Sequence, residues 1–518
     1  MNASLTRRGF LRAVGGGVFI ATLGSELAVE LGLATPLDES LPDALRFGDL
    51  EPLVSFMQET PVTRLQPALV EKLRAGVALD RLVAAAALAN ARTFGGEDYT
   101  GYHTLMALGP ALRMARCLPG PEQPLPVFKV LYRNTSRIQE NGGRKAEVLR
   151  RVEPTATPAS AGLEVVRDAV RRQAPAEVER LLAGLIQRDT DAAFQALLVA
   201  VQEDTEVHRT VLPYRAWDLL DVVGREHADA LLRQSLRYCL RAEKYRTSRW
   251  DKHSEVLVRL LDEHKLLGRE PGRREADDAF VEKLSDTIFS GSPEEAAAAA
   301  AAALAEGFRP SDVGEAITLA ANQLVLRDRG RPPSMEQPGK PVGSVHGDSI
   351  GVHASDAANA WRNLARVSRG RNTYACLILG AWQAALDRTN RGGDFLNWEP
   401  LPIQRHVNGL ASTDGALLLR ELDIAIRGNL QAQAAAIVHR LGQIGHPEAE
   451  VFQLLLRFAV SEDGALHAEK YFQTVWEEFH TTRPAFRWRH LIALARVTAS
   501  EFGRPAPGQA EARELLRV

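Results

Sequence analysis

Apolar residues recur along most of the chain at intervals of three and four, which is the spacing of one face of an α-helix. The windows with this spacing are residues 163–186, 190–202, 226–245, 277–290, 311–327, 354–367, 372–388, 415–441, 447–460 and 465–479. No run of alternating β-branched residues, which would indicate a sheet, lies between them. The pattern predicts an all-α fold of packed helical hairpins, arranged in an irregular array with pseudo-repeats.

Stretches rich in proline and glycine separate these windows. The stretches expected to form loops or linkers are residues 151–162, 268–273, 328–351 and 390–402. The division that they favour has an N-terminal helical part, a middle part and a C-terminal part over residues 35–150, 163–327 and 345–518. A loop as long as residues 328–351 is uncommon inside a compact protein and is often functional.

Residues 1–34 have a different pattern, which is typical of a twin-arginine export signal. Arg7 and Arg8 precede Phe10 and Leu11, and a weakly apolar stretch follows as far as Leu33. Five glycines and two glutamates make that stretch too polar for a membrane-spanning helix. We expect cleavage at Ala34, with Ala28 as an alternative and retention as an uncleaved anchor also open. The signal predicts a periplasmic or secreted protein that contacts the twin-arginine translocon during export.

The overall composition excludes several classes of partner. The 518 residues include 63 basic and 65 acidic side chains, for a formal net charge of −2. This balance provides no basic surface for nucleic acid, and no later apolar run is long enough for a stable membrane span. The three cysteines, Cys117, Cys239 and Cys376, are too few for a disulfide framework, and their apolar helical contexts favour buried core positions.

Four histidines occur in one recurring context. His103, His208, His353 and His467 each follow a polar or glycine-containing segment and begin a helical window. Ala-Leu or Ala-Trp pairs follow the first three of them seven to nine positions later. The recurrence predicts a duplicated helical-hairpin architecture in which the four imidazoles point into one space between helix starts.

Converging imidazoles are typical of a metal site between helices. His346, in the long loop, is a fifth candidate ligand. Tyr102 and Asp348 lie next to candidate ligands, and we assign both as candidate catalytic residues. Asp356 shares a helix face with His353, but its place near a helix start favours a capping role. Each histidine taken alone is an ordinary core or capping residue, so the metal hypothesis depends on their recurrence.

Two arginines form a separate candidate site. Arg133 and Arg137 lie four positions apart, on one face of an expected helix. Guanidinium groups bind anionic groups through paired hydrogen bonds, so these residues are candidates for substrate binding. The alternative interpretation is a solvated helix face.

Three of the histidine segments resemble the questin oxidase-like family. The matching stretches are Gly101 to Leu108, Gly351 to Ala360 and Asp463 to Lys470. Members of that family are all-helical oxidases that insert oxygen and cleave the rings of aromatic polyketides. The resemblance implies an oxidoreductase with His103, His353 and His467 at its site, and it adds Lys470 as a catalytic candidate.

Together these features predict an exported, metal-dependent oxidoreductase that acts on an unidentified small molecule. Iron or copper is preferred to zinc, because export of folded proteins is typical of redox cargo. The alternatives are a non-catalytic periplasmic scaffold or ligand-binding protein, and a zinc-dependent hydrolase. Standard nucleophile, phosphate-binding and dinucleotide-binding motifs do not occur in the sequence.

The export signal can be tested directly. Replacing both Arg7 and Arg8 by lysine should leave the precursor in the cytoplasm, because the translocon reads paired guanidinium groups and not positive charge alone. Fractionation followed by immunoblotting measures this. Normal export of the double variant, or export that stops only when the general secretory route is disabled, would contradict the prediction.

Overall fold

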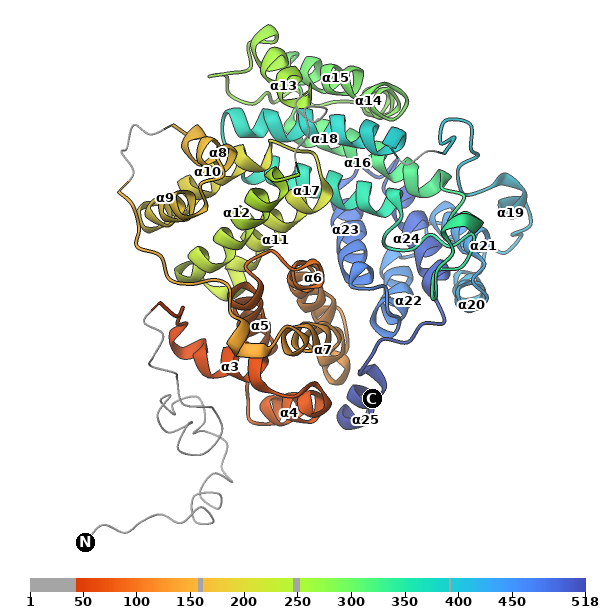
Figure 1. Ribbon diagram of the computed structural model, residues 1–518. Helices are drawn as coiled ribbons and strands as arrows, with labels where there is room; N and C mark the ends of the chain where they lie inside the picture. The colour runs from red at the N-terminus through yellow and green to blue at the C-terminus, as the bar shows by residue number, and fades with distance from the viewer. Residues whose placement is uncertain (1–42, 157–161, 246–251, 391–392) are drawn as a thin grey trace.

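The computed structural model describes residues 43–156, 162–245, 252–390 and 393–518 (Figure 1). It is 72% helical, with 23 α-helices, and the described residues form no strand. The predicted all-α fold is therefore confirmed. No helix within these ranges is long and apolar enough to cross a bilayer. The export signal expected in residues 1–34 lies outside the described residues.

The helices follow one another with short connections. The N-terminal part contains α3 (Glu51–Glu59), α4 (Val62–Arg74), α5 (Leu79–Phe94), α6 (Tyr99–Arg116) and α7 (Pro124–Glu140). The middle part contains α8 (Glu164–Arg171), α9 (Pro175–Arg188), α10 (Thr190–Val201), α11 (Val207–Val223), α12 (Ala228–Glu243), α13 (Lys252–Glu263), α14 (Asp278–Ser290), α15 (Pro293–Ala305) and α16 (Pro310–Arg327). The C-terminal part contains α17 (Ile350–Val367), α18 (Arg371–Asn390), α19 (Gln404–Asn408), α20 (Gly415–Arg427), α21 (Gln431–Gln443), α22 (Glu448–Ser461), α23 (His467–Thr481), α24 (Trp488–Glu501) and α25 (Gln509–Leu516).

The helix boundaries correct the predicted windows at three places. The window 163–186 is two helices, α8 and α9, because Gln173 has a φ of 53° and Pro175 starts a new helix. The window 415–441 is likewise two helices, α20 and α21, and Asn429 has a φ of 53° between them. Helix α17 begins at Ile350, four residues before the predicted start, because the Ser349 hydroxyl accepts a hydrogen bond from the Val352 N–H.

One continuous apolar core connects the three parts of the chain. Its buried side chains come from helices throughout the described residues, and Trp361 of α17 is the largest of those that are fully buried. Cys239 and Cys376 are buried, as predicted, whereas Cys117 is exposed just after α6, so the prediction for that cysteine is wrong. All three cysteines are free.

Four helices form a closed ring at the centre of the protein. Helix α6 contacts α11, α11 contacts α17, α17 contacts α23, and α23 contacts α6 again. Figure 1 shows these four helices around the middle of the molecule, with the other helices outside them. The histidine-bearing starts of all four lie at the same end, so the four helices of the ring run in parallel. The ring draws on all three parts of the chain.

Candidate functional site

The four predicted histidines meet at one end of the helix ring. Going round the ring, the centroids of neighbouring imidazoles lie 4.8 Å apart for His103 and His208, and 5.6 Å apart for His208 and His353. The remaining two distances are 5.3 Å from His353 to His467 and 5.2 Å from His467 to His103. We call these four side chains the histidine cluster. They are almost fully removed from solvent, except that 12% of the His208 side chain is exposed.

The imidazoles approach one another through their Nε2 atoms. The Nε2 atoms of His103 and His208 are 3.2 Å apart, and those of His353 and His467 are 3.3 Å apart. Two imidazole nitrogens bound tetrahedrally to one ion at about 2.0–2.1 Å lie roughly 3.3 Å from each other. As they stand, the rings form two pairs, and no group of three or more histidine, cysteine, aspartate or glutamate side chains in the described residues has the geometry to hold a metal ion. A shared ion therefore requires the two pairs to close on each other.

The opposite ring nitrogens determine which tautomer is present. The Nδ1 atom of His103 lies 2.7 Å from the Tyr99 carbonyl oxygen, and that of His467 lies 3.0 Å from the Ala465 carbonyl oxygen. The Nδ1 atom of His208 lies 2.6 Å from a carboxylate oxygen of Glu206. Because these oxygens can only accept, the Nδ1 atom of each of these three rings carries a hydrogen, and the Nε2 atom faces the cluster.

Protonation of two of the rings is suppressed. Burial, together with the nearby Lys470 ammonium group and the neighbouring histidines, lowers the pKa of His103 and of His467 well below the usual value. The Nε2 atoms of these two rings are therefore acceptors, and each faces the Nε2 atom of a neighbouring histidine, at 3.2 Å for His208 and 3.3 Å for His353. Either an N–H group of that neighbour or a bound cation satisfies such an acceptor.

Glu206 is a partner of the cluster that the sequence analysis did not identify. It caps α11 by accepting a hydrogen bond from the Arg209 N–H, and it also accepts one from the Tyr238 hydroxyl at 2.7 Å. Burial would raise the pKa of Glu206, but His208 and the hydrogen bonds outweigh that effect and lower the pKa to about 2. Glu206 is therefore ionised at neutral pH and accepts the Nδ1 hydrogen of His208. Histidines that bind metals commonly have a carboxylate partner of this kind.

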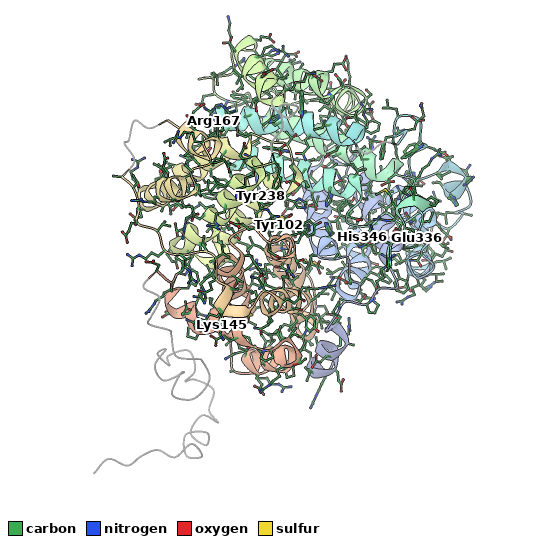
Figure 2. All side chains as sticks on the ribbon, in the orientation of Figure 1. Tyr102, Lys145, Arg167, Tyr238, Glu336 and His346 are labelled. Carbon is green, nitrogen blue, oxygen red and sulfur yellow. The ribbon has the colours of Figure 1, made fainter. Side chains whose placement is uncertain are left out.

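Two tyrosines lie against the cluster. The ring centroid of Tyr102 is 5.0 Å from that of His103 and 5.3 Å from that of His208. Figure 2 shows Tyr102 beside Tyr238, and their ring centroids are 5.2 Å apart. Burial and the Glu206 carboxylate raise the pKa of Tyr102, so the phenol keeps its proton. Tyr102 is thus a buried hydroxyl group next to the histidines.

Lys470 and Asp356 lie one helical turn after His467 and His353. Burial lowers the pKa of Lys470 to about 8, although the Asp356 carboxylate counteracts the shift. Burial raises the pKa of Asp356, which accepts a hydrogen bond from the Thr474 hydroxyl at 2.9 Å. Asp356 is 4% exposed and does not cap α17, so the capping role favoured from the sequence is wrong.

His346 and Asp348 lie outside the histidine cluster. The His346 ring centroid is 6.4 Å from that of His467, and its Nδ1 atom is 3.3 Å from Asp348. Asp348 also pairs with Arg331 and Lys340. Burial alone would raise the pKa of Asp348, but the hydrogen bonds from His346, Lys340 and Arg331 have the larger effect and lower it. Figure 2 places His346 well to the side of Tyr102. These contacts fit a role in holding the loop rather than the catalytic role assigned to Asp348.

The loop containing His346 encloses a cavity of about 570 Å³. Its walls combine His346 and Asp348 with the side chains of Phe395 and Trp398. Within the same loop, Gly347 lies directly against His467: a Cβ atom at this glycine would be 2.1 Å from the His467 Cβ atom. The long loop predicted to be functional is thus in contact with the cluster.

Helix α7 anchors the segments that lead into two of the histidines. Arg137 binds Asp98 through two nitrogens, at 3.0 and 2.6 Å, and Asp98 caps α6 ahead of His103. Arg133 pairs with Asp463, which accepts a hydrogen bond from the N–H of Ala465 ahead of His467. Because both guanidinium groups have carboxylate partners, the interpretation of Arg133 and Arg137 as ligands of a substrate anion does not fit these contacts.

Lys129 belongs to the same face of α7. Its ammonium group donates to the carbonyl oxygens of Ala459 and Glu462, and it lies 2.6 Å from a Glu469 carboxylate oxygen. Ala465 and Leu466, which precede His467, have φ values of 48° and 68°. Non-glycine residues adopt this region only under tertiary constraint, and the contacts of Lys129 and Arg133 supply one.

Two of the histidines outside the five candidates are also buried. His253 and His490 are 4% and 3% exposed. Neither lies in the histidine cluster, and burial lowers the pKa of His490 to about 4. They are ordinary core histidines.

Comparison of the chain with models of known protein families, with curated proteins and with solved structures finds no match.

Replacing Gly347 by alanine tests whether the loop sets the position of His467. The added methyl group overlaps His467 and must displace it. If the cluster binds a metal ion, we expect its affinity to fall about 10-fold or more while the helical content is unchanged. Competition with a metallochromic chelator measures the affinity. The control is Gly120→Ala, where a Cβ atom meets nothing within 4 Å. Equal affinities in the two variants would contradict the positioning role.

Replacing Arg133 and Arg137 together by glutamine tests the anchoring role of α7. Loss of both ion pairs should loosen the segments before His103 and His467. If the cluster binds a metal ion, its affinity should fall roughly 10-fold, because partners of metal ligands have effects of this size. Arg116→Gln is a control, since Arg116 forms an exposed pair with Asp80 far from the cluster. Unchanged affinity in the double glutamine variant would contradict the anchoring role.

Proposed function

We propose that the protein is an exported, metal-dependent oxidoreductase whose metal ion is held by His103, His208, His353 and His467. The observation that carries the proposal is the convergence of the four rings through their Nε2 atoms. These atoms are 3.2 Å apart in one pair and 3.3 Å apart in the other, which is the spacing of two imidazole nitrogens on one tetrahedral ion. Burial lowers the pKa of His103 and of His467, which disfavours protonation of these two rings and leaves their nitrogens available to a metal ion.

The ligand set narrows the choice of metal. Four neutral imidazoles suit iron, copper or zinc, whereas magnesium and calcium prefer oxygen ligands. An expected twin-arginine signal and the resemblance to the questin oxidase-like family both favour iron or copper. A redox-active ion at this position would supply electron transfer to a bound small molecule.

The surrounding residues have separate roles in this proposal. Glu206 holds the His208 tautomer, and Tyr102 offers a protonated hydroxyl group beside His103. Lys470 can give up or take a proton near neutral pH, because burial lowers its pKa to about 8. A metal cation nearby would favour its neutral form further. The 570 Å³ cavity formed by the loop is the proposed substrate site, since its wall residue His346 contacts His467.

Metal analysis of the protein purified from its native compartment tests the proposal. We expect about one iron or copper ion per chain by mass spectrometry, and loss of most of this metal in each of the variants His103→Ala, His208→Ala, His353→Ala and His467→Ala. His406→Ala, in α19 and outside the cluster, should retain it. Stoichiometric zinc would favour the hydrolase, and a metal-free protein that takes up no ion would favour the scaffold or ligand-binding alternative.

A further inference from the structure

The end of the helix ring opposite the histidine cluster encloses a second cavity. Its volume is about 620 Å³, which is within the usual range for small-molecule sites. The residues ten positions after each clustered histidine all line it: Arg113, Asp218, Asn363 and Glu477. Ten helical residues span about 15 Å, so this cavity and the cluster are distinct sites at the two ends of the ring.

Three buried amide side chains line the cavity in a common arrangement. The NH₂ group of Asn359 donates to Glu478 at 2.8 Å, while those of Asn363 and Gln473 donate to Glu477 at 3.2 and 2.7 Å. Carboxylates can only accept, so these bonds fix which amide atom is nitrogen. Each amide oxygen is thereby left for another donor.

Two atoms at this site have unsatisfied hydrogen-bonding capacity. The Oδ1 atom of Asn359, in a residue that is 1% exposed, and the Nη1 atom of Arg113 are buried and accept or donate no hydrogen bond within the described residues. Leaving a buried polar atom unpaired costs about 1–3 kcal/mol. A ligand that both donates and accepts hydrogen bonds would satisfy both atoms.

The charged groups of the cavity are already paired with one another. Arg113 pairs with Asp218, Arg362 pairs with Glu478, and Glu477 lies 3.7 Å from Arg113. A fully charged ligand would have to break these pairs or meet like charge. Among the described arginines that line the cavity, only Arg366 has no carboxylate partner, and its side chain is exposed at the rim. The interior therefore favours an uncharged ligand.

Aromatic surface is also available. Tyr214 and Trp476 both line the cavity, and Trp476 is 37% exposed. An aromatic ring can stack on the apolar face of a ligand while the polar groups at the ligand's edge form hydrogen bonds elsewhere. Amide oxygens, paired charges and an accessible indole are together complementary to a hydroxyl-rich ring compound.

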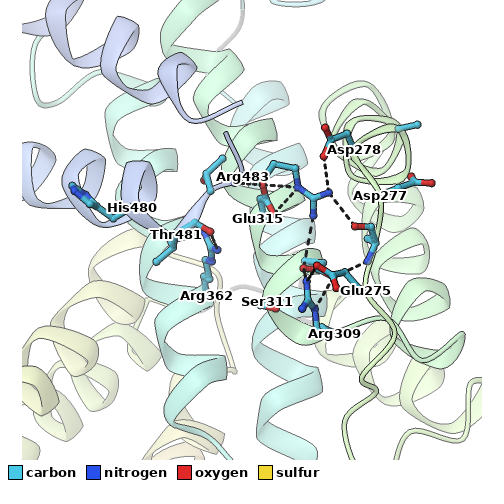
Figure 3. A pocket seen from close by; sticks show the side chains of 14 residues that line it. Glu275, Asp277, Asp278, Arg309, Ser311, Glu315, Arg362, His480, Thr481 and Arg483 are labelled. Carbon is cyan, nitrogen blue, oxygen red and sulfur yellow. Dashed lines mark hydrogen bonds and ion pairs between the residues drawn. The ribbon is translucent and has the colours of Figure 1, made fainter. Parts of the chain in front are cut away.

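The neighbouring groove does not offer a comparable site. Its volume is about 950 Å³, and it continues from the cavity past Arg362 and Thr481. Figure 3 shows that its charged side chains bind one another, with Arg483 joined to Glu315 and Asp278.

We propose that the cavity lined by Asn359, Asn363, Gln473 and Trp476 binds a neutral, polyhydroxylated ligand of the saccharide class. The amide oxygens accept from its hydroxyl groups, Arg113 donates to them, and Trp476 stacks on its apolar face. The site is independent of the metal proposal, because none of these residues belongs to the histidine cluster.

Isothermal titration calorimetry of the full-length protein with glucose, maltose and trehalose tests this proposal. At least one of these sugars should bind with a Kd below about 10 mM, a modest affinity for a site with few hydrogen bonds. Gln473→Ala and Trp476→Ala should each weaken binding about 10-fold, since each removes one favourable contact. Trp476 is 37% exposed, and circular dichroism of Trp476→Ala checks that the helical content is unchanged.

Two control variants and two charged probes keep the outcome specific. Trp398→Ala, in the cavity next to His346, and His353→Ala, in the histidine cluster, should leave sugar binding unchanged. Failure of all three sugars to bind overturns the proposal, as does tighter binding of putrescine or citrate, the cationic and anionic probes. Binding that survives Gln473→Ala and Trp476→Ala but is lost in Trp398→Ala overturns it as well. None of these results depends on whether the protein contains metal.

Discussion

Four helices that start at one point constrain the rest of this structure. Parallel helices place the positive ends of their dipoles together, and here those ends meet around four imidazoles. Such an arrangement disfavours imidazolium, and burial acts in the same direction on His103 and His467. The compensating negative charge comes from carboxylates at the helix starts, chiefly Glu206 on α11 and Asp98 on α6. His103 and His467 are therefore held neutral, with their Nε2 atoms facing the cluster.

Holding such an arrangement requires support from outside the ring. Helix α7 does not carry a clustered histidine, yet its Lys129, Arg133 and Arg137 contact the segments before or within α6 and α23. Buried ion pairs add little net stability, but they hold specific geometry when both partners are fully engaged. The left-handed residues Ala465 and Leu466 show that the start of α23 is placed by these contacts and not by local preference. The same reasoning explains why a glycine is required at position 347.

Helical periodicity and one recurring histidine context were enough to predict the fold class and the meeting of His103, His208, His353 and His467. Both are local patterns, and the ring repeats one local unit four times. The partners of the histidines could not be predicted, because Tyr238 reaches Glu206 from α12 and Arg137 reaches Asp98 from α7 only in the folded chain. Asp356 was misassigned for the same reason: its position near a helix start suggested a cap, whereas ring closure buries it beside Lys470.

The two ends of the ring differ chemically although the same four helices form both. Positions three residues after the histidines carry Lys470 and Asp356, and positions six residues after them carry Asn359 and Gln473, one further helical turn along. The first pair is enclosed and close to neutral overall, so it separates the histidine cluster from the polar cavity without leaving an uncompensated charge between them. His467, Lys470 and Gln473 lie on successive turns of α23, so one helix contributes to the cluster, to the separating layer and to the cavity. The chemical difference between the two ends therefore comes from which side chains occupy successive turns and not from a change of backbone.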